Sequence, residues 1–266
     1  MSLIKLDKLD KKILWELENN SRSSFNIIAK KLKTSKEVVN YRVKRLVNEK
    51  IIVRFFTEIN LAKLGMQVYK IYLSFQHVTE EKEKEMYHYF TEELKIPWVT
   101  SCSGKYDMVI SFGAKDINHF NEYLTKIMNK FSGNILNREL STTLFFSTYN
   151  RKWLTNSKEI KNTIVGGEIT NNLLDKTDHH ILACLSDNSR VQVLELAKKT
   201  KLTSGAIIHR IKKMEKSGVI NAYRIGLDYK KFEKEFIKCM VYLTNRTSAK
   251  EKKLISYVEQ LPQIFT

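Results

Sequence analysis

The 266-residue chain is poor in cysteine and contains no long hydrophobic run. Its three cysteines, Cys102, Cys184 and Cys239, are odd in number, far apart and without a CxxC spacing, so neither a disulfide scaffold nor a zinc cluster is expected. The start, Met1–Lys5, leads directly into a charged amphipathic helix and has no apolar signal core. No apolar stretch has the length of a membrane span. These absences predict a cytoplasmic protein without a membrane partner.

Fingerprints of catalysis are also missing from the sequence. There is no P-loop or dinucleotide-binding motif, so no cofactor is expected. His180 and Cys184 have a helical i, i+4 spacing that metal ligands can use, but two ligands do not make a zinc site. Cys102 has no evident histidine or carboxylate that would activate it. We therefore expect no metal, no catalytic residue and no enzymatic activity.

Positive charge is abundant and unevenly distributed. Forty-six Lys and Arg residues against 29 Asp and Glu give a formal net charge of +17. The basic residues exceed the acidic ones by 7 in residues 1–60, by 3 in 61–164 and by 7 in 165–266. An excess concentrated at the two ends of the chain predicts a polyanionic partner, and double-stranded DNA is the expected one.

The two basic regions are copies of one sequence. Residues 6–52 align without a gap on 174–220 at a constant offset of 168. Apolar positions stay in phase, and short identical segments recur, among them the triplet Asn-Ser-Arg at 20–22 and 188–190. Two segments that agree in this way over 47 residues are most simply two copies of a small helical module.

Each copy has the pattern of three short helices. The first covers about 9–18 and ends near Asn19 and Asn20, and the second covers about 25–32. The third is predicted to start at Thr34–Glu37, where Thr34 would cap the helix and Glu37 would complete a capping box, and to run to about Asn48. On this helix Val39, Val43 and Leu46 should be buried, as should Ile207, Ile211 and Met214 in copy two.

The outward face of the third helix is basic and rich in hydrogen-bonding groups in both copies, which is the pattern of a helix that enters the DNA major groove. Arg42 and Arg210 lie at the margin of the buried face, so we expect them to pair with a first-helix carboxylate such as Asp10 or Asp178. The residues expected to contact DNA are Ser35, Lys36, Asn40, Tyr41, Lys44 and Arg45 in copy one, and Thr203, Ser204, His209, Lys212 and Lys213 in copy two.

Strands are predicted after each third helix and throughout the middle of the chain. Residues 51–56 and 218–223 are β-branched and aromatic and would form a wing or its remnant. Residues 66–149 have the order strand, helix, strand, strand, helix, strand, the last strand covering 135–149. This βαββαβ order predicts a ferredoxin-like domain, and the fold class is therefore α+β with helix-turn-helix, winged-helix-like modules.

Taken together, the LDxxD start, the NSR triplet, the basic third helix and a βαββαβ domain with a G-x-Y-D turn resemble the Lrp/AsnC (feast/famine) family of transcriptional regulators. The resemblance covers residues 1–150 and begins again over 174–266. It implies DNA binding, transcription regulation that responds to an amino acid, and dimers formed through the βαββαβ domain. It also implies that Gly104, Tyr106 and Asp107 form part of an effector site, although the same residues would equally suit a simple turn with a strand-terminal carboxylate.

The resemblance and the repeat together divide the chain into five parts. We expect a first helix-turn-helix domain at 1–60, a ferredoxin-like effector and dimerisation domain at 61–153, a polar linker at 154–172, a second helix-turn-helix domain at 173–232 and the start of a second ferredoxin-like domain at 233–266. In that last part 236–243 is predicted to be a strand, 249–261 a helix and 262–266 the start of another strand. Residues that match 102–152 do not follow.

Three hypotheses on function and assembly remain open. The favoured one is a sequence-specific transcriptional regulator that acts as a homo-oligomer or as an internal pseudo-dimer of its two copies. A second is an architectural DNA-binding protein with little sequence preference. A third is an enzyme similar to the haem-pathway decarboxylases that share this domain pair, for which the middle segment offers His77, His88 and His119.

Overall fold

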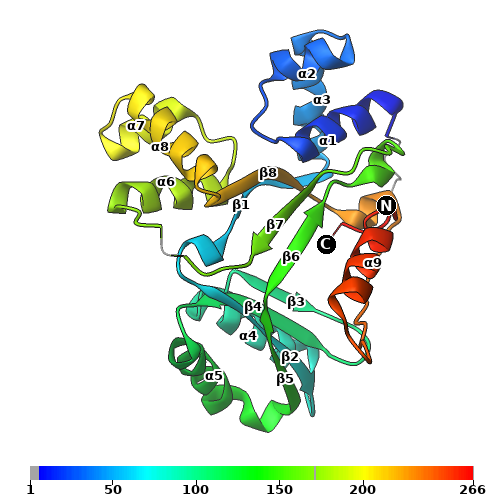
Figure 1. Cartoon of the computed structure of the whole chain (residues 1–266), viewed down its shortest axis with the longest axis vertical. Coiled ribbons are helices and arrows are strands. Elements are labelled where there is room, and N and C mark those ends of the chain that lie inside the picture. The colour runs from blue at the N-terminus through cyan, green and yellow to red at the C-terminus, as the bar shows by residue number, and fades with distance from the viewer. Residues whose placement is uncertain (1–5, 171, 266) are drawn as a thin grey trace. The chain divides into compact units, whose positions relative to one another are not determined.

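The computed structural model describes residues 6–170 and 172–265 (Figure 1). Met1–Lys5, Asn171 and Thr266, which carry parts of the predicted start, linker and final strand, lie outside the described residues. The chain forms two compact units. The helical unit consists of Met1–Ile59, Ser147–Ile164 and Leu174–Thr266, and the sheet unit of Asn60–Phe146 and Val165–Leu173. The five-part division along the sequence stays a prediction.

The helical unit contains both predicted three-helix modules, and the elements of copy two repeat those of copy one at the offset of 168 residues. The predicted helices of copy one are confirmed, and a strand follows them. The elements are α1 (Lys8–Asn19), α2 (Phe25–Leu32), α3 (Lys36–Asn48) and β1 (Ile52–Ile59) in copy one, and α6 (Lys176–Asp187), α7 (Val193–Thr200), α8 (Ser204–Lys216) and β8 (Ile220–Leu227) in copy two.

Apolar periodicity explains how each module closes on itself. Val39, Val43 and Leu46 on α3 are buried against α1 and α2, as predicted, and the equivalent residues of α8 are buried too: Ile207, Ile211 and Met214. Burying one such side chain contributes on the order of 1.5–3 kcal/mol, so these three positions alone account for much of the attachment of the third helix. The opposite face of each third helix is left for solvent.

The start of α3 differs from the prediction by one residue. The N-cap is Ser35, whose hydroxyl accepts a hydrogen bond from the Val38 amide at 3.2 Å, so the prediction of Thr34 as the cap is wrong. A cap must immediately precede the first helical residue, and α3 begins at Lys36. The capping boxes of the chain are instead at the first helix of each copy, formed by Asp7 with Asp10 in α1 and by the equivalent aspartates in α6.

The strands that follow the third helices pair with each other. β1 and β8 form an antiparallel two-stranded sheet in which Phe56 lies opposite Arg224. Neither strand forms a hairpin within its own module. α1 packs against β8 and α6 packs against β1, so each first helix contacts the strand of the other copy (Figure 1). The two modules are therefore interleaved within one unit.

The sheet unit has the predicted ferredoxin-like order. Its strands are arranged β3-β4-β2-β5 and are antiparallel throughout, and both long helices bury their apolar residues against the same face of the sheet. Phe90 and Phe131 are fully buried there and meet edge to face at 5.8 Å. The elements are β2 (Gln67–Phe75), α4 (Glu80–His88), a π-helical turn (Tyr89–Glu93), β3 (Trp98–Ser101), β4 (Met108–Ala114), α5 (Ile117–Phe131) and β5 (Ile135–Thr143).

The predicted last strand is interrupted, and part of the predicted linker is a strand. β5 stops at Thr143, β6 (Phe145–Tyr149) continues the chain, and β7 (Asn162–Gly166) pairs with β6. Gly166 is essential to this arrangement because its φ is +102° and a Cβ there would lie 2.6 Å from the carbonyl oxygen of Leu144. The remaining short elements are 3₁₀ turns: Leu61–Lys63, Ser132–Asn134, Lys152–Leu154 and Tyr229–Phe232.

The repeat continues structurally past residue 232, with one exception. α9 (Ser248–Val258) occurs where the offset of 168 places the counterpart of α4, and Thr247 caps it as Thr79 caps α4. The predicted strand at 236–243 is wrong, because these residues have no regular structure. A strand requires hydrogen-bonding neighbours, and none of the described strands pairs with residues 236–243. No described helix is long and apolar enough to cross a membrane.

Candidate nucleic-acid interface

The outward faces of α3 and α8 carry most of the residues predicted to contact DNA. Tyr41 is 69% exposed, whereas Asn40 and Arg45 are half-buried. In copy two Ser204 is half-buried. The remaining predicted contact residues are exposed: Ser35, Lys36 and Lys44 in copy one, and Thr203, His209, Lys212 and Lys213 in copy two. Each module thus presents a basic helix to solvent, and the contact residues themselves stay predictions.

Two of the predicted contact residues also hold the start of their helix. The Ser35 hydroxyl accepts from the Val38 amide, and the Thr203 hydroxyl accepts from the Ala206 amide, each at 3.2 Å. These hydrogen bonds satisfy one of the free amides at each helix N-terminus. The hydroxyl hydrogens remain available as donors, and a phosphate oxygen is a suitable acceptor at a helix start.

An arginine on the third helix anchors it to the first helix, as predicted from the sequence. Arg42 Nη1 lies 2.9 Å from Asp10 Oδ1 and 2.5 Å from Asp7 Oδ2. Asp10 is itself buried, so its charge is compensated by the guanidinium rather than by water. The same contacts occur in copy two, at 2.7 Å each: Arg210 with Asp175 and with Asp178.

Arg45 is restrained in a way that the sequence did not indicate. Its Nη2 lies 2.6 Å from Asp10 Oδ2, so Asp10 pairs with two arginines at once. The equivalent residue of copy two, Lys213, is exposed. The third helices, α3 and α8, which we call the recognition helices, therefore differ at this position. α3 has an arginine paired with Asp10, and α8 has an exposed lysine.

These ion pairs predict an acid-sensitive fold. The hydrogen bond from Arg42 lowers the pKa of Asp7, and the Asp178 amide together with Arg210 lowers the pKa of Asp175. A carboxyl with a lowered pKa stabilises the fold fully above its ordinary value of 3.8, and the contribution is lost as the pH falls through the lowered pKa. We expect the double variant Asp7→Asn/Asp175→Asn to be less stable at pH 6 and to lose less stability than the wild type on acidification to pH 3.

Thermal unfolding between pH 3 and pH 6 measures this effect. Asp187→Asn, which removes an exposed carboxylate at the end of α6, is the matched control and should leave the pH dependence unchanged. If the unfolding temperature of the wild type and of the double variant changes equally with pH, Asp7 and Asp175 are not the cause of the loss of stability in acid.

The Asn-Ser-Arg triplets join the two modules in a reciprocal interlock. Ser21 Oγ and Ser189 Oγ are hydrogen-bonded at 2.6 Å and fully buried. Arg22 donates to the carbonyl oxygens of Ser189 and Val191, and Arg190 donates to those of Ser21 and Ser23. Each contact made by one copy is thus returned by the other. The sequence marked the triplet as a repeat, but only the fold shows its role.

Backbone hydrogen bonds extend the same pattern into the strands. The Ser21 amide donates to Tyr223 in β8 at 2.9 Å, and the Ser189 amide donates to Phe55 in β1 at 3.1 Å. Tyr223 and Phe55 are equivalent positions of the repeat. Burial, together with the nearby positive charge of Arg22, lowers the pKa of Arg190. The two copies are therefore related by a pseudo-two-fold axis that passes close to the serine pair.

One buried cluster of charges breaks this symmetry. Glu18 is 1% exposed and pairs with Arg151 and with Arg224, whose Nη1 is 3.3 Å from Glu18 Oε1. Arg224 Nε also lies 3.2 Å from Glu58, which accepts from the Thr163 hydroxyl. Burial raises the pKa of Glu18, and the two guanidinium groups oppose that shift. We refer to Glu18, Glu58, Arg151, Arg224 and Thr163 as the Glu18 cluster.

The repeat does not duplicate the Glu18 cluster. At the equivalent positions Glu18 is replaced by Ser186, Glu58 by Gly226 and Arg224 by Phe56. Arg151 comes from the segment between the copies, where its Nε donates to the Tyr229 hydroxyl at 2.9 Å. The cluster therefore distinguishes the two modules from one another at the centre of their shared strand pair.

Comparison with known proteins identifies the family. A family described as "Winged helix-turn-helix DNA-binding" matches residues 6–53 and 174–221. The chain is 34% identical to HTH-type transcriptional regulator Ptr1 of Methanocaldococcus jannaschii over 121 residues, which are 46% of this chain and 80% of Ptr1. It is 32% identical to HTH-type transcriptional regulator LrpC of Bacillus subtilis over 91 residues, 34% of this chain and 62% of LrpC. This chain belongs to the Lrp/AsnC family of transcriptional regulators.

A solved structure extends the likeness beyond one module of this Lrp/AsnC chain. The siroheme decarboxylase NirDL matches 82% of this chain and 65% of its own, with a TM-score of 0.54 and 12% sequence identity. At that identity the match concerns the fold alone. It shows a likeness of fold over most of the length of the present regulator.

In the Lrp/AsnC chain, hydrogen bonds and ring packing hold the turn that is predicted to bind an effector. Asp107 accepts from the Phe75 amide at 2.7 Å, and its own amide donates to Leu73 at 2.9 Å. Gly104 has a φ of +126°, which the turn requires. Tyr106 is buried and packs against Tyr72 at 5.0 Å between ring centroids. These contacts give the three residues a structural role, and effector binding by them stays a prediction.

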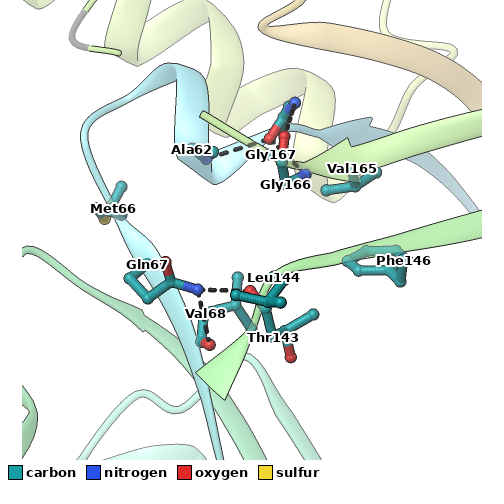
Figure 2. A pocket seen from close by; sticks show the side chains of 11 residues that line it. Ala62, Met66, Gln67, Val68, Thr143, Leu144, Phe146, Val165, Gly166 and Gly167 are labelled. Carbon is teal, nitrogen blue, oxygen red and sulfur yellow. Dashed lines mark hydrogen bonds between the residues drawn. The ribbon is translucent and has the colours of Figure 1, made fainter. Parts of the chain in front are cut away.

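A small pocket lies elsewhere in the sheet unit (Figure 2). Its volume, about 10 Å³ for the centre of a water-sized sphere, accommodates roughly one water molecule. Gln67 donates to Thr143 across it, and the Gly167 amide donates to Leu144 at 2.8 Å. The described residues that line the pocket do not include Gly104, Tyr106 or Asp107. This pocket is too small for an amino acid.

Residues considered for metal or enzyme chemistry are scattered. Within the described ranges 6–170 and 172–265, no group of three or more His, Cys, Asp and Glu residues is placed to hold a metal ion. Cys184 Sγ contacts His180 Nε2 at 3.9 Å. Arg151, which follows the last strand of the first copy, is occupied by the Glu18 cluster. His119 Nδ1 accepts from the Lys115 amide at the start of α5.

Proposed function

We propose that this Lrp/AsnC chain binds an operator with two inverted half-sites, using α3 for one and α8 for the other. The observation that carries the proposal is the reciprocal interlock, in which Arg22 and Arg190 each donate to backbone carbonyls of the other module. A pair of modules related by a two-fold axis reads a DNA sequence with matching inverted symmetry. One polypeptide would thus supply what two subunits supply in a homodimer, as an internal pseudo-dimer.

Charge supports DNA as the ligand of both modules. The exposed Lys44 and Lys212 occupy equivalent positions, so each helix offers a cation for the phosphate backbone at the same place. Phosphate contacts fix the position of a protein on the duplex, and groups such as those of Tyr41 and His209 are then available for base edges. The proposal makes the chain a binding protein rather than an enzyme. An amino-acid effector at Gly104–Asp107 remains a part of the proposal supported by family membership.

Selection from a randomised duplex library tests the proposal. The full chain is incubated with the library at a low and a higher salt concentration, and the DNA retained at the higher salt is sequenced. A motif of two inverted half-sites about 10 bp apart, or a multiple of that, supports the proposal. DNA retained without a motif would indicate an architectural protein. No retention at either salt, with a Soret absorbance after porphyrin addition, would indicate an enzyme.

The salt dependence of binding gives a separate prediction. We expect Lys44→Ala and Lys212→Ala each to weaken binding to every duplex and to reduce the salt slope by about 0.9, since each removes one phosphate contact. The measurement is fluorescence anisotropy over a range of potassium chloride concentrations. Lys84→Ala, on the exposed surface of α4, is the control and should leave the slope unchanged. Slopes equal to wild type for both variants would contradict this use of the helices.

A further inference from the structure

We infer that the operator is directional: its two half-sites differ in sequence, and the chain binds it in one orientation only. This inference rests on the proposed function and specifies the DNA that the two modules read. A homodimer with two-fold symmetry reads two identical inverted half-sites. In the present chain the interlock that joins the two modules is symmetric, but the surfaces that face DNA are not.

The positions of the third helix that contact the rest of its own module are similar in the two copies. Val39 corresponds to Ile207, and Arg42 to Arg210, with both arginines making the same pair of contacts to aspartates. The interlock is also the same in both directions. Both third helices therefore share these attachments, and α3 has the Arg45–Asp10 pair in addition, so each should approach its groove with a similar geometry.

The outward positions have diverged. Of the five predicted contact positions on α3 itself, only Lys44 has an identical counterpart, Lys212. The other four pairs differ in size, charge or hydrogen-bonding groups: Lys36 and Ser204, Asn40 and Ile208, Tyr41 and His209, Arg45 and Lys213.

These differences change the base edges that can be recognised. An asparagine can form two hydrogen bonds with adenine in the major groove, whereas an apolar side chain contacts the thymine methyl group. Asn40 and the exposed Ile208 therefore favour different bases at equivalent positions of the two half-sites. Arg45 is held by Asp10 at 2.6 Å, while Lys213 is exposed. Two helices that approach DNA in a similar way should therefore recognise different base sequences.

Reciprocal replacement of the reading residues tests the inference. Ile208→Asn/His209→Tyr/Lys213→Arg gives copy two the copy-one residues at three of the four differing positions, and Asn40→Ile/Tyr41→His/Arg45→Lys does the opposite. The pair Lys36 and Ser204, at the helix start, is left unchanged. Library selection with the wild type should return two unlike half-sites. Each triple variant should return a palindrome, the first built from one wild-type half-site and the second from the other. The wild type should bind its own operator at least about 10-fold more tightly than either palindrome, because single mismatched base pairs carry penalties of that size.

Orientation is measured independently with a DNA-cleaving reagent attached to a single cysteine. In a background with Cys102, Cys184 and Cys239 replaced by serine, a reagent on Lys30→Cys should cut near one half-site only, and on Lys198→Cys near the other only. Cutting near both half-sites by each labelled protein, or a palindrome selected by the wild type, overturns the inference. A motif with a single half-site, or no motif, would instead contradict the proposed function, so the two failures are distinguishable.

Discussion

Replacing Glu18 with glutamine should lower the free energy of unfolding of the helical unit by about 3–5 kcal/mol. The substitution keeps the shape of the side chain but removes the negative charge that faces Arg151 and Arg224, both of which are buried. Breaking a buried ion pair from one side has a cost of this order because an uncompensated charge remains in the interior. Arg151 is affected most, since Arg224 keeps its contact with Glu58.

Urea unfolding followed by tryptophan fluorescence measures the loss. In a Trp98→Phe background the remaining tryptophans, Trp15 and Trp153, report on the helical unit. Glu16→Gln is the matched control on the same helix. It breaks a pair with the exposed Lys31 and should change the stability by less than about 1 kcal/mol. If the Glu18 variant does not fold, Glu18→Leu/Arg151→Met should restore folding, because removing both charges avoids the uncompensated one.

A Glu18→Gln variant that unfolds within about 1 kcal/mol of the wild type would contradict the role given to the cluster. So would a Glu18→Leu/Arg151→Met variant less stable than Glu18→Gln. Either result would mean that the arginines find water or other acceptors when Glu18 is neutral.

Inserting five base pairs between the half-sites of the operator should reduce affinity by about 10²–10⁴-fold. The insertion turns the second half-site by about half a helical turn, so it faces away from α8 when α3 is bound. The factor is the avidity gained when a second linked module binds without a separate association step. The interlock prevents one module from rotating relative to the other to follow the displaced half-site. Ser21 and Arg22 of one module, and Ser189 and Arg190 of the other, form hydrogen bonds across the contact in both directions.

The matched control for the insertion is an operator in which one half-site is scrambled at the original spacing. It should lose as much affinity as the five-base-pair insertion, since in both cases only one module is engaged. Anisotropy titrations of the three duplexes at one salt concentration make the comparison. A loss below about 10-fold on insertion, together with a large loss on scrambling, would show that the modules move independently.

The parts of the structure that were predicted from the sequence are those set by local rules. Apolar spacing determined α1–α3, and the arginine at the edge of the buried face of α3 could be matched to Asp10 because both lie on neighbouring helices. The alternating and helical patterns of 66–149 gave the order of the ferredoxin-like fold. Repetition then transferred each of these predictions to copy two.

The parts that were missed depend on contacts between distant segments. The interlock joins residues about 168 positions apart, and Glu18 contacts Arg224 across 206 positions. A usable signal was nevertheless present in the repeat. Glu18, Glu58 and Arg224 are charged where the other copy has Ser186, Gly226 and Phe56, and charged residues at buried positions require partners. A search for positions at which the two copies differ, rather than agree, would have predicted that these three residues contact one another.

The interlock of both modules within one polypeptide has a consequence for gene dosage. A regulator that must first assemble from two subunits fills its operator with a sigmoid dependence on its own abundance, because free subunits are inactive at low expression. In this chain β1 and β8 are paired as soon as one molecule has folded. If this pair of modules alone reads both half-sites, as proposed, operator occupancy should rise hyperbolically with the abundance of the chain.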